Sequence, residues 1–109
     1  MTTLSLPLTG LKLITIEQYG AAPFGTMYLA DLGAEVIKIE NHQSDGEMGR
    51  HVVPYSEGGD SLFFQTFNCN KKCLALDLKT PAGQEILGRI VTGADALINN
   101  LRGDLPAKL

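Results

Sequence analysis

Short apolar, β-branched runs alternate along this chain with stretches whose apolar residues recur at helical spacing. The first apolar run, 11–17 (LKLITIE), is long enough for one buried strand, and 35–40 (EVIKIE) predicts a second. Between them we expect a turn over 20–25 and a helix over 24–32, with Gly33 as its C-terminal stop. This order of strand, turn, helix and strand is half of a mononucleotide-binding βαβ unit.

The stretch 41–60 has a different pattern. It is polar, it holds four of the chain's glycines and one proline, and it shows no sustained periodicity. A connection of this length is longer than usual in a compact domain, so we interpret it as a functional or mobile loop. Residues 61–67 predict a short helix or turn with three aromatic rings that we expect to pack in the core, namely Phe63, Phe64 and Phe67.

A second βαβ-like pattern follows. The run 73–78 (CLALDL) predicts a third strand, and Thr80 with Pro81 predicts the start of a helix. Apolar residues at helical spacing give that helix a face against the sheet: Ile86, Leu87, Ile90 and Val91. We expect it to end at Gly93, a fourth strand over 95–99, and the start of another element from residue 102. The whole pattern predicts an α/β fold with an open, largely parallel sheet and Rossmann-like βαβ units.

Composition narrows the class of protein. The chain has 109 residues, 44% of them hydrophobic and 19% charged, which is typical of a globular domain. Its net charge of −3 disfavours a nucleic-acid partner, whose usual footprint is basic. No run approaches the roughly 20 apolar residues of a membrane span. The N-terminus has no signal-peptide pattern, so we expect a cytoplasmic protein without a membrane partner.

The reactive side chains give little direct evidence of catalysis. Cys69 and Cys73, the only cysteines, have no nearby histidine cluster, so we expect no metal site and two reduced thiols in or near the core. His42 and His51 flank the long loop, and we interpret them as surface residues. The pattern identifies no nucleophile and no general base.

The segment between the first strand and the helix partly matches two known phosphate-binding motifs. The segment 20–26 (GAAPFGT), in which Pro23 suits the first helical position, lacks the lysine that an NTPase phosphate loop needs after its second glycine. Glu40 lies 20 residues after Gly20, where dinucleotide-binding folds place the acid that binds the ribose, but Ala22 occupies the place of the second glycine. Dinucleotide binding therefore stays open as the weaker alternative.

Ligands of open parallel sheets lie beyond the carboxyl ends of the strands. Lys79, at the end of the third strand, is therefore better placed to bind a phosphate than Lys71 or Lys72, which we expect in a solvated turn. Arg102 follows the fourth strand at the same edge and is a candidate partner for a phosphate or carboxylate.

Three ordered blocks carry a resemblance to a known family: GLKLITIEQYGAAPFGTMYLADLGAEVIKIE, FNCNKKCLALDLKTPAG and ADALINNLRGD. They closely resemble the N-terminal part of class III CoA-transferases, the CaiB/BaiF family. The resemblance implies transfer of CoA from an acyl-CoA to a carboxylic acid through an aspartyl intermediate, in an interlocked homodimer. It implies CoA or acyl-CoA as a substrate and no permanently bound cofactor. An acyl-CoA racemase of the same fold and a stand-alone CoA- or nucleotide-binding module remain alternatives.

The resemblance also places the family's CoA-binding positions on this chain. They are Gln18, Gly20, Ala21, Asn41, Leu76, Asp77, Leu78, Lys79, Asn100, Leu101, Arg102 and Lys108. At Asn41 relatives often carry a basic residue, and at Gly20 some transferases carry a glutamine near the reacting thioester. Gln18 is our hypothesis for a substitute of that glutamine.

The family's catalytic aspartate lies downstream of the region that this chain matches. We therefore expect residues 1–109 to form the N-terminal, CoA-binding part of the family's large domain, incomplete relative to that domain. A chain of this kind carries part of the CoA site and no nucleophile, so we expect it to be inactive alone.

Overall fold

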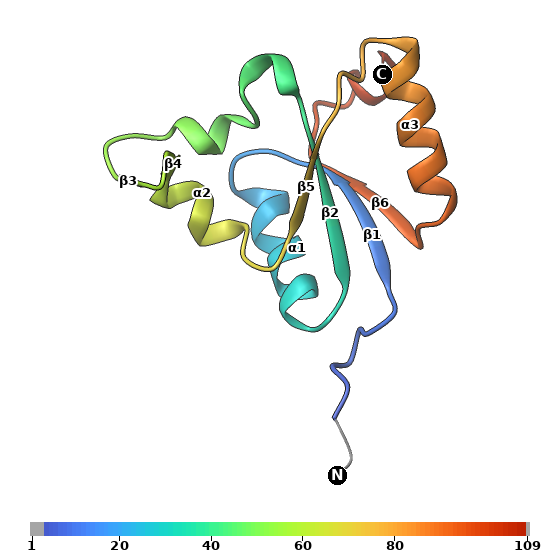
Figure 1. Cartoon of the computed structure of the whole chain (residues 1–109), viewed down its shortest axis with the longest axis horizontal. Helices are drawn as coiled ribbons and strands as arrows, with labels where there is room; N and C mark the ends of the chain where they lie inside the picture. The colour runs from blue at the N-terminus through green and yellow to red at the C-terminus, as the bar shows by residue number, and fades with distance from the viewer. Residues whose placement is uncertain (1–3, 109) are drawn as a thin grey trace.

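Four parallel strands form the main sheet of the computed structural model, which describes residues 4–108 (Figure 1). In spatial order they are β5 (Lys72–Ala75), β2 (Glu35–Glu40), β1 (Lys12–Ile16) and β6 (Ala96–Asn99). Every neighbouring pair is parallel. The predicted α/β fold with an open, parallel sheet is confirmed.

Helices cover the two faces of the sheet. Helix α1 (Ala21–Asp31) connects β1 to β2 on one face, and α3 (Pro81–Thr92) connects β5 to β6 on the other (Figure 1). The chain thus leaves β1 toward one face and enters β6 from the opposite face. The neighbouring ends of β1 and β6 form a topological switch point, where ligands of such sheets bind.

Alternating residues of the central strands build a core on each face. Leu13 of β1 and Val36 of β2 pack with α1, whereas Ile14 and Ile39 pack with α3. Strands β1 and β2 are covered on both faces, which explains why their sequences are nearly continuous apolar runs. Ile14 is fully buried in this arrangement.

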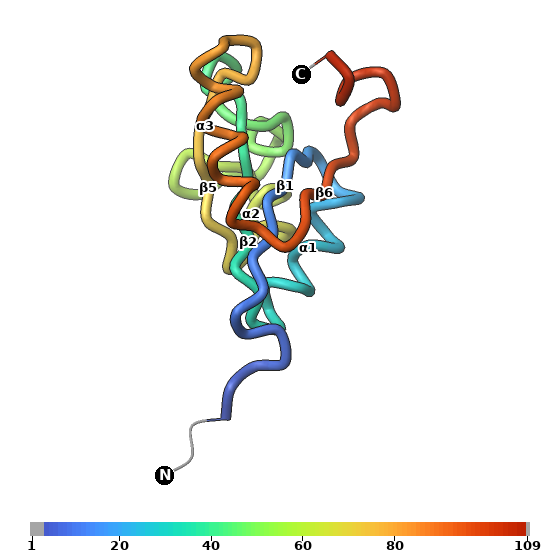
Figure 2. The backbone as a smooth tube through the Cα atoms, turned by 90° about the vertical axis from the view of Figure 1, so that its right-hand side faces the viewer, coloured from blue at the N-terminus to red at the C-terminus, as the bar shows by residue number. Residues whose placement is uncertain are grey.

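The long polar stretch is more structured than the sequence predicted. It contains two short 3₁₀ turns and an antiparallel hairpin before a short helix: η1 (His42–Ser44), η2 (Met48–His51), β3 (Ser56–Glu57), β4 (Asp60–Ser61) and α2 (Leu62–Phe67). Phe64 of α2 is buried, as expected, and the Phe63 and Phe67 rings contact each other with centroids 5.0 Å apart. After β6, the element expected from residue 102 is a single 3₁₀ turn, η3 (Pro106–Lys108). This last segment lies at the end of the molecule away from the N-terminus (Figure 2).

Two predicted boundaries were wrong. Helix α1 begins at Ala21, so Pro23 is its third residue, because the N–H of Phe24 already donates to the carbonyl of Gly20 at 2.8 Å. The third strand ends at Ala75 and not at residue 78. The Asp77 carboxylate accepts the backbone N–H of Lys79 at 3.0 Å and bends the chain into a turn.

The predicted helix ends are confirmed where their chemistry is specific. Gly33 follows α1 with a φ of +105°, which glycine adopts readily. The Thr80 hydroxyl caps α3 by accepting the N–H of Gly83 at 3.1 Å. Gly93 is the C-terminal cap of the same helix.

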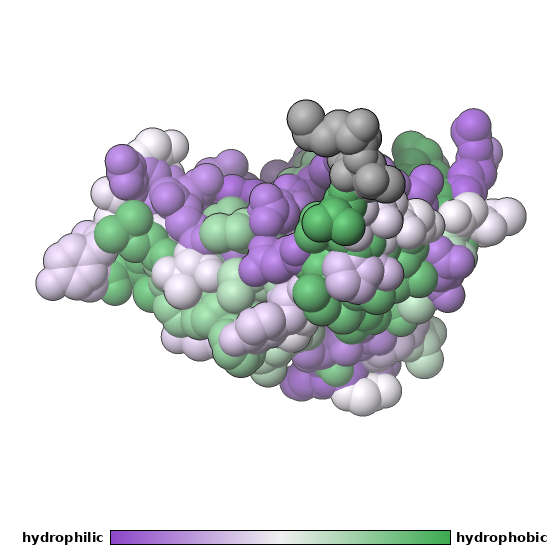
Figure 3. Space-filling model, turned by 90° about the horizontal axis from the view of Figure 1, so that it is seen from below, coloured by the Kyte–Doolittle hydropathy of each residue, from purple (hydrophilic) through white to green (hydrophobic). Residues whose placement is uncertain are grey.

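Apolar side chains also reach the surface, as the green areas of Figure 3 show. Phe24 and Tyr28 of α1 and its C-cap residue Leu32 are each exposed by 44% or more, and Leu97 of the edge strand β6 is 46% exposed. Within residues 4–108, no helix combines the length and apolarity needed to cross a bilayer.

Candidate functional site

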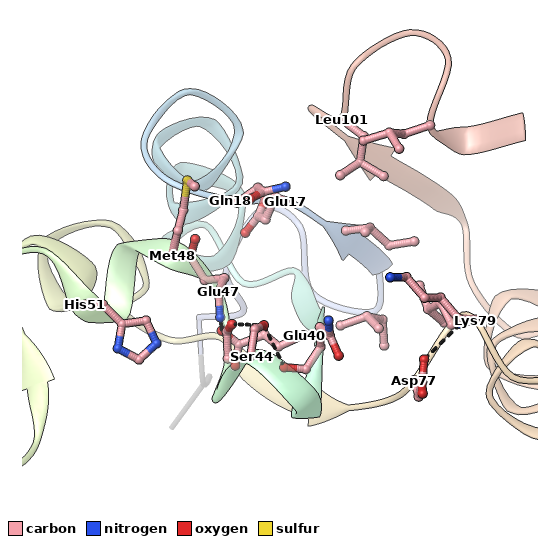
Figure 4. Close-up of a pocket in the computed structure, with 16 residues that line it drawn as sticks. Glu17, Gln18, Glu40, Ser44, Glu47, Met48, His51, Asp77, Lys79 and Leu101 are labelled. Atoms are coloured by element: carbon pink, nitrogen blue, oxygen red, sulfur yellow. Dashed lines mark hydrogen bonds between the residues drawn. The ribbon is translucent and has the colours of Figure 1, made fainter. Parts of the chain in front are cut away.

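A cleft of about 470 Å³ lies beyond the carboxyl ends of the strands, next to the switch point (Figure 4). It is lined by the exits of β1 and β2, the turn after β5, the segment after β6 and the two 3₁₀ turns η1 and η2. In Figure 4, Asp77 and Lys79 lie on one side of the cleft, opposite Met48 and His51. The cleft therefore occupies the place that the topology assigns to a ligand.

Half of the predicted site residues line this cleft: Gln18, Asn41, Asp77, Leu78, Lys79 and Leu101. Gly20 and Ala21 lie at the start of α1 beside it, and Leu76 is buried in the core below it. The structure thus brings together residues from four separate sequence segments. Their role in CoA binding stays a prediction.

Asn100 closes the switch point through its side chain. Its amide oxygen accepts the backbone N–H of Gln18 at 3.0 Å, and its amide nitrogen donates to the carbonyl of Gln18 at 2.9 Å. This pair of bonds continues the pairing of β1 and β6 beyond the last strand residues. Asn100 thus fixes the exit of β1 against the exit of β6, and its side-chain amide is already engaged.

The two basic site residues predicted after β6, Arg102 and Lys108, both pair with Asp104, and neither of them lines the cleft. Asp104 lies 3.6 Å from the Arg102 guanidinium and 2.8 Å from the Lys108 ammonium. All three side chains are more than half exposed, so these ion pairs are weak and an anionic ligand can replace Asp104.

Lys79 is the cation that lines the cleft. Its backbone N–H is held by Asp77, whose other carboxylate oxygen accepts from the Gln43 amide at 2.8 Å. Asp77 thereby connects the turn after β5 to η1. The Lys79 ammonium pairs with no acidic group among the described residues, so it is available to an anion.

Sequence reasoning missed a buried network of charges beneath the cleft. Lys71, expected in a solvated turn, is fully buried at its side chain and lies 2.7 Å from the equally buried Glu17 carboxylate. Its ammonium also donates to the Asn68 amide oxygen at 3.2 Å, and Lys38 donates to the same oxygen at 2.8 Å. Burial lowers the pKa of Lys71, and its hydrogen bond to Glu17 opposes that shift.

The network continues through Glu47 to a second group of charges. Lys38 is fully buried and lies 3.2 Å from the Glu47 carboxylate. The backbone N–H of Glu47 donates to Glu40 at 3.3 Å, and Arg50 contacts Glu40 at 2.8 Å and Asp60 at 2.9 Å. The paired residues are 7 to 10 positions apart, which matches no helix or strand period, so no spacing motif reveals them. An alternation of charged and apolar residues in a buried strand (Lys38 and Glu40 in EVIKIE) was the available signal.

The surroundings of Glu40 argue against the dinucleotide alternative. In that alternative Glu40 would offer a free carboxylate to a ribose. In the structure Glu40 is only 7% exposed, and its carboxylate accepts hydrogen bonds from both Nε and Nη2 of Arg50. Hydrogen bonding to Glu40 also raises the pKa of Arg50, and the guanidinium lies 3.8 Å from the centre of the Phe64 ring. Glu40 is therefore committed to an internal ion pair.

The expectation that both thiols lie in or near the core was wrong, since Cys69 and Cys73 are both exposed. Cys69 follows α2 and donates to the Gln65 carbonyl at 3.4 Å, and Cys73 lies on the edge strand β5. Leu74 of this strand packs with α3, so the neighbouring Cys73 points to the opposite face of the sheet. His42 and His51 are exposed, as predicted, and His51 lines the cleft.

The environment of Cys73 gives a testable pH dependence. Its sulfur lies 3.5 Å from Arg50, and partial burial, with the nearby Glu40 charge, raises the thiol pKa above the ordinary 9.0. Since the thiolate is the reactive form, we expect alkylation of Cys73 by iodoacetamide to keep accelerating above pH 9. Peptide mass spectrometry across pH 7–10.5 measures the rate at this site. A rate that levels off below pH 9 would contradict the raised pKa.

An open parallel sheet with helices on both faces and a ligand-sized cleft at its switch point defines a doubly wound α/β protein. Comparison with known proteins makes the assignment specific. The model of the CoA-transferase family III matches residues 8–109, and the chain belongs to that family. The sequence-based resemblance to class III CoA-transferases is confirmed.

Individual relatives agree with the family assignment. The chain is 34% identical to succinate–glutarate CoA-transferase of Agrobacterium fabrum, over 94% of this chain and 27% of the relative. It is 36% identical to formyl-CoA:oxalate CoA-transferase of Escherichia coli, over 89% of this chain and 23% of the relative. A CaiB/BaiF family protein from Brucella suis superimposes with a TM-score of 0.85 at 32% identity, covering 96% of this chain and 29% of the other. The chain thus spans about a quarter of the length of these relatives.

Proposed function

We propose that residues 1–109 provide the CoA-binding part of a CoA-transferase that moves CoA from an acyl-CoA to a carboxylic acid. The observation that carries this proposal is the cleft at the switch point, in which six of the positions expected to bind CoA meet. Its lining combines apolar residues with one unpaired cation, Lys79. An apolar groove beside a cation suits a long pantetheine arm ending in phosphates.

We further propose that the reacting aspartate is supplied from outside these residues. Its carboxylate attacks the acyl-CoA thioester and releases CoA thiolate, which then attacks the aspartyl carbonyl and releases the donor acid. The acceptor acid repeats the exchange in reverse and leaves as the new acyl-CoA. The carboxylates that line the cleft support this division of labour. Glu17, Glu40, Glu47 and Asp77 are each held by hydrogen bonds within the described chain, so none is free to attack.

The same reasoning extends to location and assembly. We propose a cytoplasmic protein that takes part in a homodimer of the interlocked kind that the family resemblance implies. The exposed aromatic residues of α1 and the open edge of β6 support an association surface, because apolar groups and unpaired strand edges are normally covered. Without the segment that carries the aspartate, we expect the 109-residue chain to show no CoA transfer.

Replacing Lys79 by alanine tests the binding proposal. We expect the affinity for CoA, measured by isothermal titration calorimetry, to fall about tenfold, since one charge-assisted contact contributes about 1.4 kcal/mol. Lys72→Ala is the matched control, because Lys72 is exposed like Lys79 but lies at the start of β5, outside the cleft lining, and pairs with Glu35 at 2.9 Å. It should leave the affinity unchanged. Absence of CoA binding by the unmodified chain, or tighter binding of NAD than of CoA, would refute the proposal.

A further inference from the structure

Within residues 4–108, the Glu47 side chain hydrogen-bonds segment 41–60, to which it belongs, to the turn before α1. One carboxylate oxygen accepts the backbone N–H of Tyr19 at 2.7 Å and that of Gly49 at 3.1 Å. The other accepts from the Lys38 ammonium at 3.2 Å. The Glu47 side chain is only 5% exposed, so water does not compete for these bonds.

The turn that Glu47 holds is conformationally demanding. Tyr19 has a φ of +65°, which is uncommon for a residue with a side chain, and Gly20 follows it directly. A left-handed tyrosine persists only when its surroundings fix it, and the bond from Tyr19 to Glu47 is a contact of that kind. Gly49, on the other side of the carboxylate, has no room for a side chain, because a Cβ there would touch the Glu47 carboxylate.

Both anchored segments border the cleft. Gln18 precedes Tyr19 and lines the cleft, and Met48 and His51 of η2 line it as well. In Figure 4 the Glu47 side chain lies between Gln18 and the η1 segment. A displacement of either segment therefore changes the shape of the cleft.

We propose that Glu47 is a positioning residue, which fixes the β1–α1 turn against the segment 41–60 and so sets the geometry of the cleft. Lys38 neutralises the buried Glu47 carboxylate, and the backbone N–H groups of Tyr19 and Gly49 orient this carboxylate. The role concerns the shape of the free protein. Its consequence for CoA rests on the proposed function above.

The test compares two variants that both remove the buried charges. In Lys38→Met/Glu47→Gln, the glutamine oxygen still accepts the N–H groups of Tyr19 and Gly49. In Lys38→Met/Glu47→Ala, no acceptor remains, although neither variant leaves a buried charge unpaired. The exposed residue Glu57 of β3 supplies a control for the segment itself, Glu57→Ala.

Amide hydrogen exchange, measured by NMR, tests whether Glu47 holds Tyr19 and Gly49 in place when no ligand is bound. We expect the amides of Tyr19 and Gly49 to exchange about tenfold faster in the alanine double variant than in the glutamine double variant. The amide of Ile14, in the core of β1, should exchange at the same rate in both. Equal exchange at Tyr19 and Gly49 in the two variants would overturn the proposal. So would loss of cooperative unfolding in the alanine variant alone, since Glu47 would then determine the fold and not a local position.

Calorimetry with CoA tests whether the position of the turn held by Glu47 affects ligand binding in the cleft. We expect the alanine double variant to bind CoA about tenfold more weakly than the glutamine double variant, and Glu57→Ala to bind like the unmodified chain. A chain that binds no CoA in any form refutes the proposed function, while the exchange rates still decide the role of Glu47. Equal CoA affinity in the two double variants, with faster exchange in one, would show that the anchored turn does not shape the cleft and would overturn that part of the proposal.

Discussion

Glu17→Gln should destabilise this chain by about 3 kcal/mol, since it leaves the buried Lys71 ammonium without a counter-charge. Both side chains have no solvent exposure, and their atoms lie 2.7 Å apart. The Thr26 hydroxyl, which donates to Glu17 at 2.8 Å, connects the same carboxylate to α1. The loss is a large fraction of the roughly 5–15 kcal/mol by which proteins of this size are stable. Urea denaturation followed by circular dichroism measures it.

Two further variants separate the buried charge from the substitution itself. Glu35→Gln makes the same change at an exposed carboxylate that pairs with Lys12 and Lys72, so its cost should stay under about 0.5 kcal/mol. Lys71→Met combined with Glu17→Gln removes both charges, and we expect it to recover part of the lost stability. Equal stability of Glu17→Gln and Glu35→Gln would show that the buried pair does not have the proposed energetic role.

The sheet and its helices were predictable because their signals are local. The β-branched runs of β1 and β2 and the helix ends at Gly33 and Thr80 depend on neighbouring residues alone, and the structure agrees with them. The placement of Lys79 at a strand exit was predictable for a similar reason, since a parallel sheet collects the carboxyl ends of its strands at one edge.

The interior of the site was not predictable, because its contacts join residues distant in sequence. Lys71 seemed to belong to a polar turn, yet its partner Glu17 lies 54 positions earlier. Residues 41–60 seemed irregular for the same reason. Glu47 is buried there through contacts with Tyr19 and Lys38, and Gly49 through contacts with Glu47 and Ser61. The stretch carries no periodic pattern of its own. A loop held by buried ionic groups has the composition of a solvated one.

Helix α3 packs closely against the turn after β5, and we expect a substitution at this contact to have the second large effect on stability. Gly83 lies in the first turn of α3 and is buried against the backbone carbonyl of Asp77. A Cβ at this position would overlap the Asp77 carbonyl oxygen and would also meet the Thr80 hydroxyl at 3.2 Å. Only a movement of the helix or the turn relieves such an overlap, because backbone atoms cannot rotate away.

Gly83→Ala should therefore destabilise the chain by about 3 kcal/mol, although alanine favours helix formation more than glycine does. Gly88→Ala is the matched control, since Gly88 lies in the same helix with no atom near its missing Cβ. It should stabilise the chain by about 1 kcal/mol. Because Asp77 holds Lys79 in the cleft, Gly83→Ala should also weaken CoA binding, whereas Gly88→Ala should not. Thermal unfolding that shifts in the same direction in both variants would contradict the close approach of α3 to this turn.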